Sequence, residues 1–286
     1  MSAYKSFAVI GVGQVGQYVL QGLVKAKEEG KIDSIVVFTR SAEGNPEATK
    51  LGIKSVQVDY SDKDAIAAAL KGIDVLVSTV GAFGLGTQPT LAHAAKEAGV
   101  KLFIPAEYGA PAIDMGGGKS KLRALLREIG LPFTIFFVGV FMSSFFTARM
   151  KVDLPGGAVT IGGKGDNPLT VTTVKDIGLY IAYALTTLSP EKLEGKTILI
   201  EGDRVEIKGL IAEYEKRTGK KVEISYKPVE ELKTSAAGNP YDFNSLLWLT
   251  VEDGQGVIGA PDEVNLYAPS GWNPTKALDY LLNESD

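Results

Sequence analysis

The stretch FAVIGVGQVGQYVL (residues 7–20) places three glycines, in a G-x-G-x-x-G spacing, between an apolar run and a helical pattern. The first glycine of such a turn allows a tight bend, the second lets the backbone approach a pyrophosphate, and the third lets the helix pack close to the strand. The start of the helix offers free N–H groups and a partial positive charge to phosphates. We therefore predict a dinucleotide site whose contacts come from Gly11, Gly13, Gln14, Val15 and Gly16. The alternative is a glycine-rich turn that holds no ligand.

The chain around this stretch alternates short β-rich runs with helical patterns. We predict strands over residues 7–10, 35–38, 55–58, 75–78, 102–105 and 133–137. We predict helices over residues 14–29, 46–51, 62–71, 89–98 and 119–129, with Ser61 as the N-cap of the third. The strand cores show little alternation of apolar and polar residues, which is typical of strands covered on both faces. The pattern predicts an α/β fold with a Rossmann-type, doubly wound parallel sheet.

The end of the second strand, VVFTRS (residues 36–41), carries an arginine where an NAD-binding domain usually has Asp or Glu. A guanidinium at Arg40 can pair with a 2′-phosphate through two hydrogen bonds and offers nothing specific to an unphosphorylated ribose. We therefore predict NADP(H) rather than NAD(H) as the cofactor. The alternative is an exposed loop arginine.

Further cofactor contacts are predicted from position, because ligands of open α/β sheets bind beyond the carboxyl ends of the strands. Asp59 follows the third strand, where a carboxylate could meet the adenine amino group. Thr79, Val80 and Gly81 follow the fourth strand and are small enough for a cofactor to cross.

The sequence changes its rhythm after about residue 147, where turns and short strands replace the regular alternation. Helices are predicted over 174–187, 206–218, 228–235 and 275–283, and the segments TILIEG and KVEISYK have the composition of strands. We predict an NADP-binding Rossmann domain in residues 1–150. Residues 151–286 are predicted to form a smaller α/β substrate lobe that is interleaved with the sheet edge.

Composition excludes several classes of protein. A net charge of −4 and a pI near 5.3 argue against nucleic-acid and acidic-membrane partners. The absence of cysteine excludes disulfides and thiolate metal sites, and the single histidine, His93, makes a catalytic triad or a transition-metal site improbable. The most apolar run, residues 131–146, is shorter than a membrane span, and the N-terminus lacks a basic leader. We expect a cytoplasmic protein with a small-molecule substrate and no metal, either monomeric or homodimeric.

The catalytic residue cannot be assigned from the signature of ordinary short-chain dehydrogenases, because no tyrosine is followed four residues later by lysine. Lys119, at the start of a predicted helix, shares a helical face with Arg123, while Lys121 points elsewhere. The helix dipole and desolvation would both disfavour its ammonium form, which suits proton transfer. A solvated face of three cations is the equally weighted alternative.

The ordered string of motifs resembles the NmrA-like and isoflavone-reductase-like family of atypical short-chain dehydrogenases. Besides the glycine loop and Arg40, LFIPAEYG (residues 102–109) is similar to the family's RFxPSEFG. KSKLRALLREIGLPFTIF (119–136) is similar to its KxxVRRAIExxGIPYTYV, and VTTVKDIGLYIA (171–182) to its DIG element. The resemblance places the family's catalytic lysine on Lys119, and not on Lys121.

The resemblance implies a reductase in which NADPH delivers hydride to a small aromatic, phenylpropanoid-like or otherwise conjugated substrate while Lys119 acts as general acid/base. The family also contains non-catalytic NADP(H) sensors and regulators, and an isomerase or other tailoring enzyme is a third possibility. Val12, Ala106 and the short glycine-rich segment before Lys119 depart from the family pattern, and we expect that segment to be a mobile loop. Candidate substrate contacts are Phe83, Tyr108, Phe141, Met142 and Phe145, and core packing is the alternative for the last three.

Overall fold

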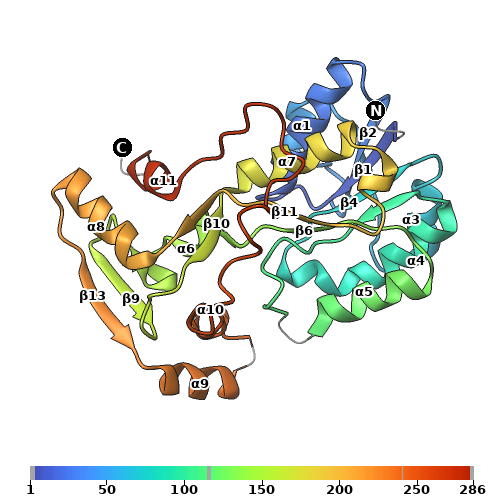
Figure 1. Cartoon of the computed structure of the whole chain (residues 1–286). Helices are drawn as coiled ribbons and strands as arrows, with labels where there is room; N and C mark the ends of the chain where they lie inside the picture. Colours follow the sequence, from blue (N-terminus) through green and yellow to red (C-terminus); the bar gives the residue numbers. More distant parts are fainter. Residues whose placement is uncertain (1–3, 115–116, 240, 284–286) are drawn as a thin grey trace.

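A parallel five-stranded sheet forms the centre of the computed structural model, which describes residues 4–114, 117–239 and 241–283 (Figure 1). Its strand order is β3-β2-β1-β4-β5. The strands are β1 (Ser6–Ile10), β2 (Ser34–Thr39), β3 (Ser55–Gln57), β4 (Val75–Ser78) and β5 (Leu102–Ile104). The helices between and after them are α1 (Gly16–Glu28), α2 (Pro46–Lys50), α3 (Lys63–Ala69), α4 (Gln88–Ala98) and α5 (Gly118–Glu128). The predicted doubly wound α/β fold is confirmed.

Both faces of this sheet are buried, as the continuous apolar strands predict. Phe7 and Val9 of β1 pack into a core on the α1 side, whereas Ala8 and Ile10 pack into a second core with α3, α4 and α5. All four side chains are completely buried. This alternation follows from the two-residue period of a strand, which sends successive side chains to opposite faces.

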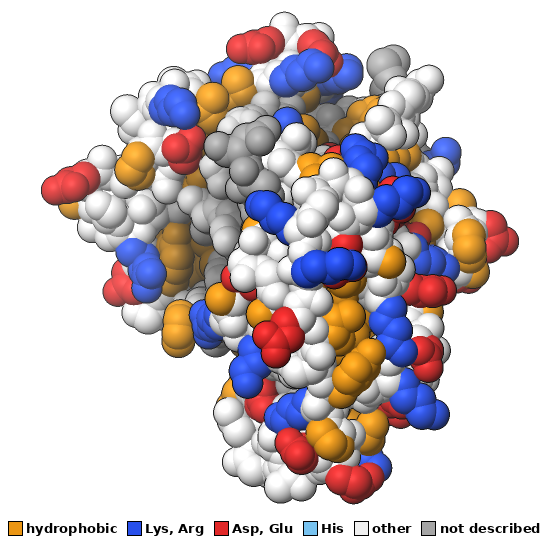
Figure 2. Space-filling model, turned by 90° about the vertical axis from the view of Figure 1, so that its left-hand side faces the viewer, with side chains coloured by type: hydrophobic (Ala, Val, Ile, Leu, Met, Phe, Trp, Pro, Cys, Tyr) orange, Lys and Arg blue, Asp and Glu red, His pale blue; other side chains and the backbone are white. Residues whose placement is uncertain are grey.

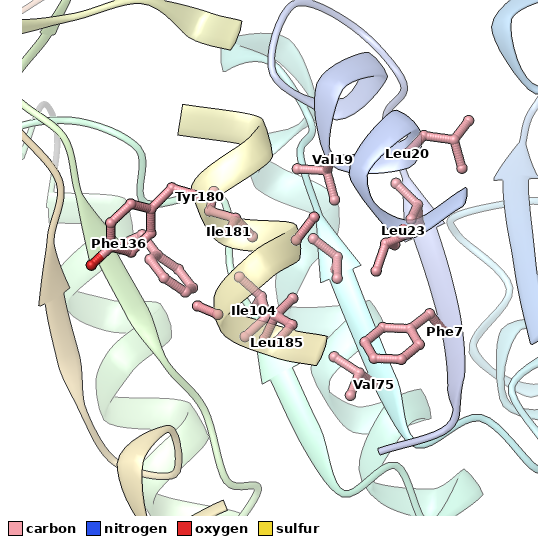
Figure 3. Packing of buried hydrophobic residues seen from close by; sticks show 14 of the residues in the cluster. Phe7, Val19, Leu20, Leu23, Val75, Ile104, Phe136, Tyr180, Ile181 and Leu185 are labelled. Carbon is pink, nitrogen blue, oxygen red and sulfur yellow. The ribbon is translucent and has the colours of Figure 1, made fainter. Parts of the chain in front are cut away.

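A helix from the second half of the chain completes the α1 side of the sheet. In Figure 3, Ile181 and Leu185 of α7 (Val174–Thr187) lie beside Val19 and Leu23 of α1. The two helices approach closely, because a Cβ placed on Gly22 of α1 would lie 2.5 Å from the Cβ of Ala182. The first hydrophobic core therefore contains residues from both halves of the chain.

The sheet edge also receives strands from later in the sequence. Phe103 of β5 forms a parallel bridge with Phe133, and β6 (Ile135–Phe137) pairs in parallel with β11 (Thr197–Leu199). Leu199 Cα faces Phe137 Cα in this register, and Ile200 N–H continues the pairing by donating to Phe137 O over 2.9 Å. The predicted TILIEG strand is thus found at this edge.

The second lobe has its own core between two small sheets and a set of helices. One sheet has the order β12-β10-β7 and the other β13-β9-β8. The strands are β7 (Val140–Phe141), β8 (Val152–Asp153), β9 (Ala158–Gly162), β10 (Leu169–Thr172), β12 (Asp203–Val205) and β13 (Glu223–Lys227). The helices are α6 (Met142–Phe145), α8 (Ile207–Thr218), α9 (Val229–Gly238), α10 (Phe243–Glu252) and α11 (Ala277–Asn283). In Figure 1 this lobe lies opposite α3 and α4.

Short 3-10 helices connect several of these elements: η1 (Ala82–Thr87), η3 (Ala148–Met150) and η4 (Pro190–Lys192). The cap of α3 differs from the sequence expectation, which placed it at Ser61. Asp62 is the cap instead, and its carboxylate accepts a hydrogen bond from Ala65 N–H over 2.9 Å. Gly99 ends α4 in the left-handed conformation, as expected just past a helix C-terminus.

The surface is mixed in charge. Figure 2 shows Lys and Arg side chains interspersed with Asp and Glu over the face of the molecule that it presents. His93 is exposed on α4. Among the residues that the structure describes, no helix is long and apolar enough to cross a membrane, and no group of three or more metal-ligating side chains is found.

Candidate active site

The glycine loop is in tight contact with the end of β4. A Cβ on Gly11, whose φ is +87°, would lie 2.8 Å from the backbone of Thr79 and Val80. The Thr79 hydroxyl donates hydrogen bonds to Ile10 O over 3.1 Å and to Gly11 O over 2.5 Å. The Thr79 hydroxyl thus has a structural role, because its hydrogen bonds hold the backbone of the glycine loop against the end of β4.

The outer side of the loop is open. No atom lies within 4 Å of the position that a Gly13 Cβ would take, and Gly13 and Gln14 are exposed. Gly16 and Val15 are buried, and a Cβ on Gly16 would lie 2.4 Å from the Thr79 hydroxyl oxygen. Helix α1 begins without a side-chain cap and without an acidic residue in its first turn, so its positive end faces this open space. The loop therefore fits the diphosphate of a dinucleotide.

Arg40 lies free at the end of β2. Its side chain is exposed and its guanidinium carbon lies 5.9 Å from the ring centre of Tyr60. The Tyr60 hydroxyl donates to Phe38 O over 2.8 Å, and burial raises the pKa of that phenol to about 12. Within residues 4–114, 117–239 and 241–283, no carboxylate forms an ion pair with Arg40. The cation is thus available to an external anion.

The other predicted cofactor contacts lie at the same edge of the sheet. Asp59 is exposed, and its carboxylate accepts hydrogen bonds from the backbone and hydroxyl of Ser61, which hold the pKa of that carboxyl below its usual range. Val80 is half-buried and Gly81 is exposed beyond the end of β4. Their contacts with a cofactor remain predictions.

A chain of contacts leads from the glycine loop to Lys119. Tyr108, in the segment after β5, donates its hydroxyl proton to Ser78 O over 3.0 Å and so joins this segment to the end of β4. Gly109 follows, and a Cβ placed on it would lie 3.3 Å from Lys119 Nζ. The lysine ammonium therefore lies against the backbone that continues from the sheet edge beside the loop.

Lys119 shares its surroundings with a buried ion pair. Glu107 is completely buried, and both its carboxylate oxygens accept hydrogen bonds from Arg123 Nη1 at 2.9 Å. Lys119 and Arg123 lie on one face of α5, as their spacing predicts, and both act electrostatically on Glu107. The apolar stripe of the same helix, with Leu122 and Leu126 buried, packs it onto the sheet.

The pKa values of Lys119 and Glu107 are shifted in opposite directions. Burial lowers the pKa of Lys119, while the carboxylates of Glu107 and Asp114 oppose that shift and the cation of Arg123 reinforces it. Burial raises the pKa of Glu107 against the pull of the Lys119 and Arg123 cations. A lysine whose proton is held less tightly than usual is suited to acid–base work.

The start of α5 carries a carboxylate that the sequence argument from the helix dipole did not include. Asp114 accepts hydrogen bonds from Lys119 N–H over 3.1 Å and from Ser120 N–H over 2.8 Å. A carboxylate at these N–H groups offsets the positive end of α5. Met115 and Gly116 lie outside the described residues, so the expected mobile loop stays a prediction there. Gly117, with φ +67°, is the residue from which α5 begins.

A groove of about 340 Å³ opens beside Lys119, between η1 and the first turns of α5. Its apolar walls include Leu85, Pro89 and Leu125. Lys121 is exposed, as expected, but it also lines this groove together with Lys119.

The family model of the NmrA-like family matches residues 4–251, which is most of the chain. The chain belongs to the NmrA-like family.

Individual relatives agree with this assignment. An isoflavone reductase homolog of Solanum tuberosum is 30% identical over 245 residues, covering 78% of this NmrA-like chain and 77% of the relative. Phenylcoumaran benzylic ether reductase TP7 of Nicotiana tabacum is 27% identical, with 82% of each chain covered. A crystal structure of isoflavone reductase has a TM-score of 0.80 at 22% identity, over 99% and 100% of the two chains. AtPrR2 with NADP+ and (+)-pinoresinol has a TM-score of 0.80 at 20% identity, over 98% and 99%.

The predicted substrate residues of this NmrA-like chain fall into two groups. Phe83 is completely exposed on η1, and Tyr108 and Phe141 are half-buried. Met142 and Phe145, by contrast, are completely buried in the core of the second lobe, where Phe145 packs against Phe146 and Trp248. The structure gives these two residues the packing role that the sequence left as the alternative.

Sequence reasoning missed three polar residues of the site. Glu107 and Asp114 approach Lys119, and Gln88, which is buried, accepts a hydrogen bond from Ala106 N–H over 2.7 Å. Glu107 lies inside the LFIPAEYG motif. An acidic residue in a mostly apolar motif was the sequence signal that could have identified it. Gln88 and Asp114 lie in loops and helix starts where the sequence offered no such signal.

Proposed function

We propose that this chain is an NADP(H)-dependent reductase of a small aromatic or conjugated metabolite. The observation that carries the proposal is the continuous run of contacts from the phosphate loop, through Thr79, Ser78 and Tyr108, to the partly buried ammonium of Lys119. On this proposal, the cofactor cradle and the proton-transfer group lie along one sheet edge. The family membership and the reductases among the relatives support the same reading.

The cofactor would be held by residues of three segments. The glycine loop with the first turn of α1 would bind the diphosphate, Arg40 would bind the 2′-phosphate, and the segment 79–81 would contact the cofactor at the end of β4. When bound, NADPH supplies a hydride. AtPrR2 binds NADP+ in its crystal structure, which supports this choice of cofactor for a chain of the same fold.

Lys119 holds a proton at Nζ and donates it to the substrate atom on which negative charge develops. Its lowered pKa makes that donation easier near neutral pH, because an acid works best when its pKa lies close to the working pH. Glu107 counteracts the desolvation of the ammonium and keeps Lys119 charged until the transfer. The apolar groove beside the lysine suits an aromatic or conjugated skeleton.

Cofactor selectivity tests the first half of the proposal. Calorimetry should give tighter binding of NADP(H) than of NAD(H), and Arg40→Ala should weaken NADP(H) binding by roughly 10- to 100-fold, because hydrogen bonds to a charged group are lost. Binding of NAD(H) should not change in that variant. Equal loss for both cofactors would remove Arg40 from the recognition of the 2′-phosphate.

Turnover tests the second half. NADPH oxidation would be followed against a panel of aryl ketones, enones and benzylic ethers. Lys119→Ala should lower kcat by about 10²- to 10⁴-fold while NADPH affinity stays within a few-fold of the wild type. Lys71→Ala, which changes an exposed lysine outside the groove, is the matched control and should retain activity. Full turnover by Lys119→Ala would exclude the lysine from the reaction, and cofactor binding without turnover on any substrate would favour a sensor.

A further inference from the structure

A second pocket lies in the second lobe, at the junction of η3, β9, the end of β13 and the start of α10. It is an open pocket of about 230 Å³, and it shares no lining residue with the groove at Lys119. In Figure 1 the elements around it, β9, β13 and α10, lie on the side of the molecule away from α3 and α4. The pocket is therefore distinct from the candidate active site.

Three cations line this pocket: Arg149, Lys151 and Lys227. Lys227 Nζ donates to the Ser235 hydroxyl over 2.9 Å and to the Ser245 hydroxyl over 3.4 Å, and neither partner carries a charge. In the described part of the chain, none of the three cations forms an ion pair with a carboxylate. Cations gathered around one space repel each other unless an anion lies between them.

The backbone of Lys151 is fixed at the rim of the pocket. Its φ of 58° and ψ of 32° are left-handed, a conformation that glycine adopts more readily than lysine. Lys151 O accepts from Thr160 N–H over 2.7 Å, and the preceding carbonyl, Met150 O, accepts from the Asn244 side chain over 2.8 Å. The surrounding structure thus holds a lysine where glycine would fit with less strain.

Asp242 is the one acid in the lining; it forms no salt bridge with the three cations, although the charge of Lys227 acts on its carboxylate. Its carboxylate accepts a hydrogen bond from Ser245 N–H over 3.2 Å and so caps α10. This hydrogen bonding to Ser245 lowers the pKa of Asp242, so the carboxylate stays charged. Three cations and one carboxylate leave an excess of two positive charges in the lining. Trp248, which is almost completely buried, supplies an apolar wall.

We propose that this pocket binds a small oxyanion ligand of two negative charges, such as a phosphate ester or a dicarboxylate. The charge excess matches a dianion, the volume limits the ligand to a few atoms beyond the charged groups, and the guanidinium and ammonium donors suit oxygen acceptors. The site is independent of the proposed reductase function, so either can fail without the other.

Thermal unfolding of the full chain tests the proposal, because a ligand that binds only the folded state raises Tm in proportion to the logarithm of its concentration once that concentration exceeds Kd. Inorganic phosphate and succinate would be titrated separately at constant ionic strength, with chloride making up the difference. A rise in Tm of this logarithmic form is expected for at least one of them, and the pair distinguishes a phosphate from a carboxylate source. The absence of such a rise with both anions would overturn the proposal.

Three variants connect the effect to the pocket. Lys151→Gly fits the left-handed backbone, so the variant should keep or raise the Tm measured without anion. Its affinity for the anion should fall by about tenfold or more, because the substitution removes one charge-assisted contact. Asp242→Asn keeps the helix cap and should strengthen anion binding, because it removes the one negative charge. Lys164→Ala, an exposed lysine outside the lining, is the control and should bind the anion like the wild type.

Two further results would count against the site. Unchanged anion affinity in both Lys151→Gly and Asp242→Asn would show that the anion binds elsewhere. Loss of the phosphate effect in Arg40→Ala, with Lys151→Gly unaffected, would place the phosphate at the cofactor loop instead.

Discussion

At the glycine loop, backbone atoms in van der Waals contact determine the arrangement, whereas around Lys119 charged side chains determine it. Gly11 and Gly16 have no room for a methyl group, because Thr79 fills the space on the inner side of the turn. Glu107 instead attracts both Lys119 and Arg123, the two cations repel each other, and Lys119 keeps contact with solvent. The first region is sensitive to volume and the second to charge.

The difference separates two contributions to a binding site. The loop offers backbone N–H groups that any dinucleotide diphosphate can use, so its shape is demanding but its selectivity is low. The pKa of Lys119 depends on the balance between burial and the neighbouring charges, and a single substitution can shift that pKa. We therefore expect substitutions in the loop to change the free energy of unfolding and cofactor binding. Substitutions around Lys119 should change the pH dependence of activity and of stability.

The largest expected effect is that of Gly11→Ala. The new Cβ would lie 2.8 Å from the backbone of Thr79, and residue 11 itself has a left-handed backbone conformation. Because the contact is with backbone atoms, it cannot be relieved easily by movement of a side chain. The left-handed strain and the overpacking together should lower the free energy of unfolding by about 3 kcal/mol. Urea denaturation measures this loss.

Gly13→Ala is the matched control, since its Cβ would point into open space. It should leave the free energy of unfolding within about 0.5 kcal/mol of the wild type but weaken NADP(H) binding, because the backbone can no longer approach the diphosphate. Equal destabilisation by the two alanines would contradict the steric distinction between the inner and outer sides of the loop.

An intermediate effect is expected for Arg123→Ala. Glu107 would lose both hydrogen bonds from the guanidinium while staying buried, and we expect a loss of about 2 kcal/mol in the free energy of unfolding. The same change removes a repulsive cation near Lys119, so the pKa of Lys119 should rise and the pH profile of kcat should shift to higher pH. Arg217→Ala, an exposed arginine on α8, should change neither quantity. A stability loss with an unmoved pH profile would mean that Arg123 is only structural.

The smallest effect is expected in the pH dependence of stability. Burial holds the pKa of Lys119 below its usual value of 10.5, so between the folded-state pKa and that value the unfolded chain binds more protons. Stability should therefore rise with pH through that window by a contribution from Lys119. The rise, measured by urea denaturation at a neutral and an alkaline pH, should be smaller in Lys119→Met than in the wild type. Parallel pH curves for the two proteins would show that the lysine titrates normally.

The sequence predicted the sheet because its signals are local. Apolar strands, the glycine spacing and the glycine after α4 each follow from a few neighbouring residues, and the structure has them at the expected places. The cap of α3 was missed by one residue because Ser61 and Asp62 are both good cap residues, and only the backbone decides between them.

The site was predicted less completely, because its charges come from segments that are distant in sequence. Lys119 could be selected from its helix and motif, but its neighbour Glu107 reaches it only through the fold. The carboxylate of Asp114, which accepts hydrogen bonds from the first N–H groups of α5 and offsets its dipole, was also not foreseen. Burial of Met142 and Phe145 likewise depends on how the second lobe packs around α6, which periodicity does not reveal.

The close contact of α7 with α1 has a consequence for how the chain is made. A ribosome releases the five strands of the central sheet well before residues 174–187, yet one face of that sheet is completed by α7. Until that helix emerges, Val19, Leu23 and their neighbours lack the partner that covers them. A nascent chain stopped near residue 150 would present this apolar face to chaperones or to other chains, so the amino-terminal half should not mature alone during synthesis.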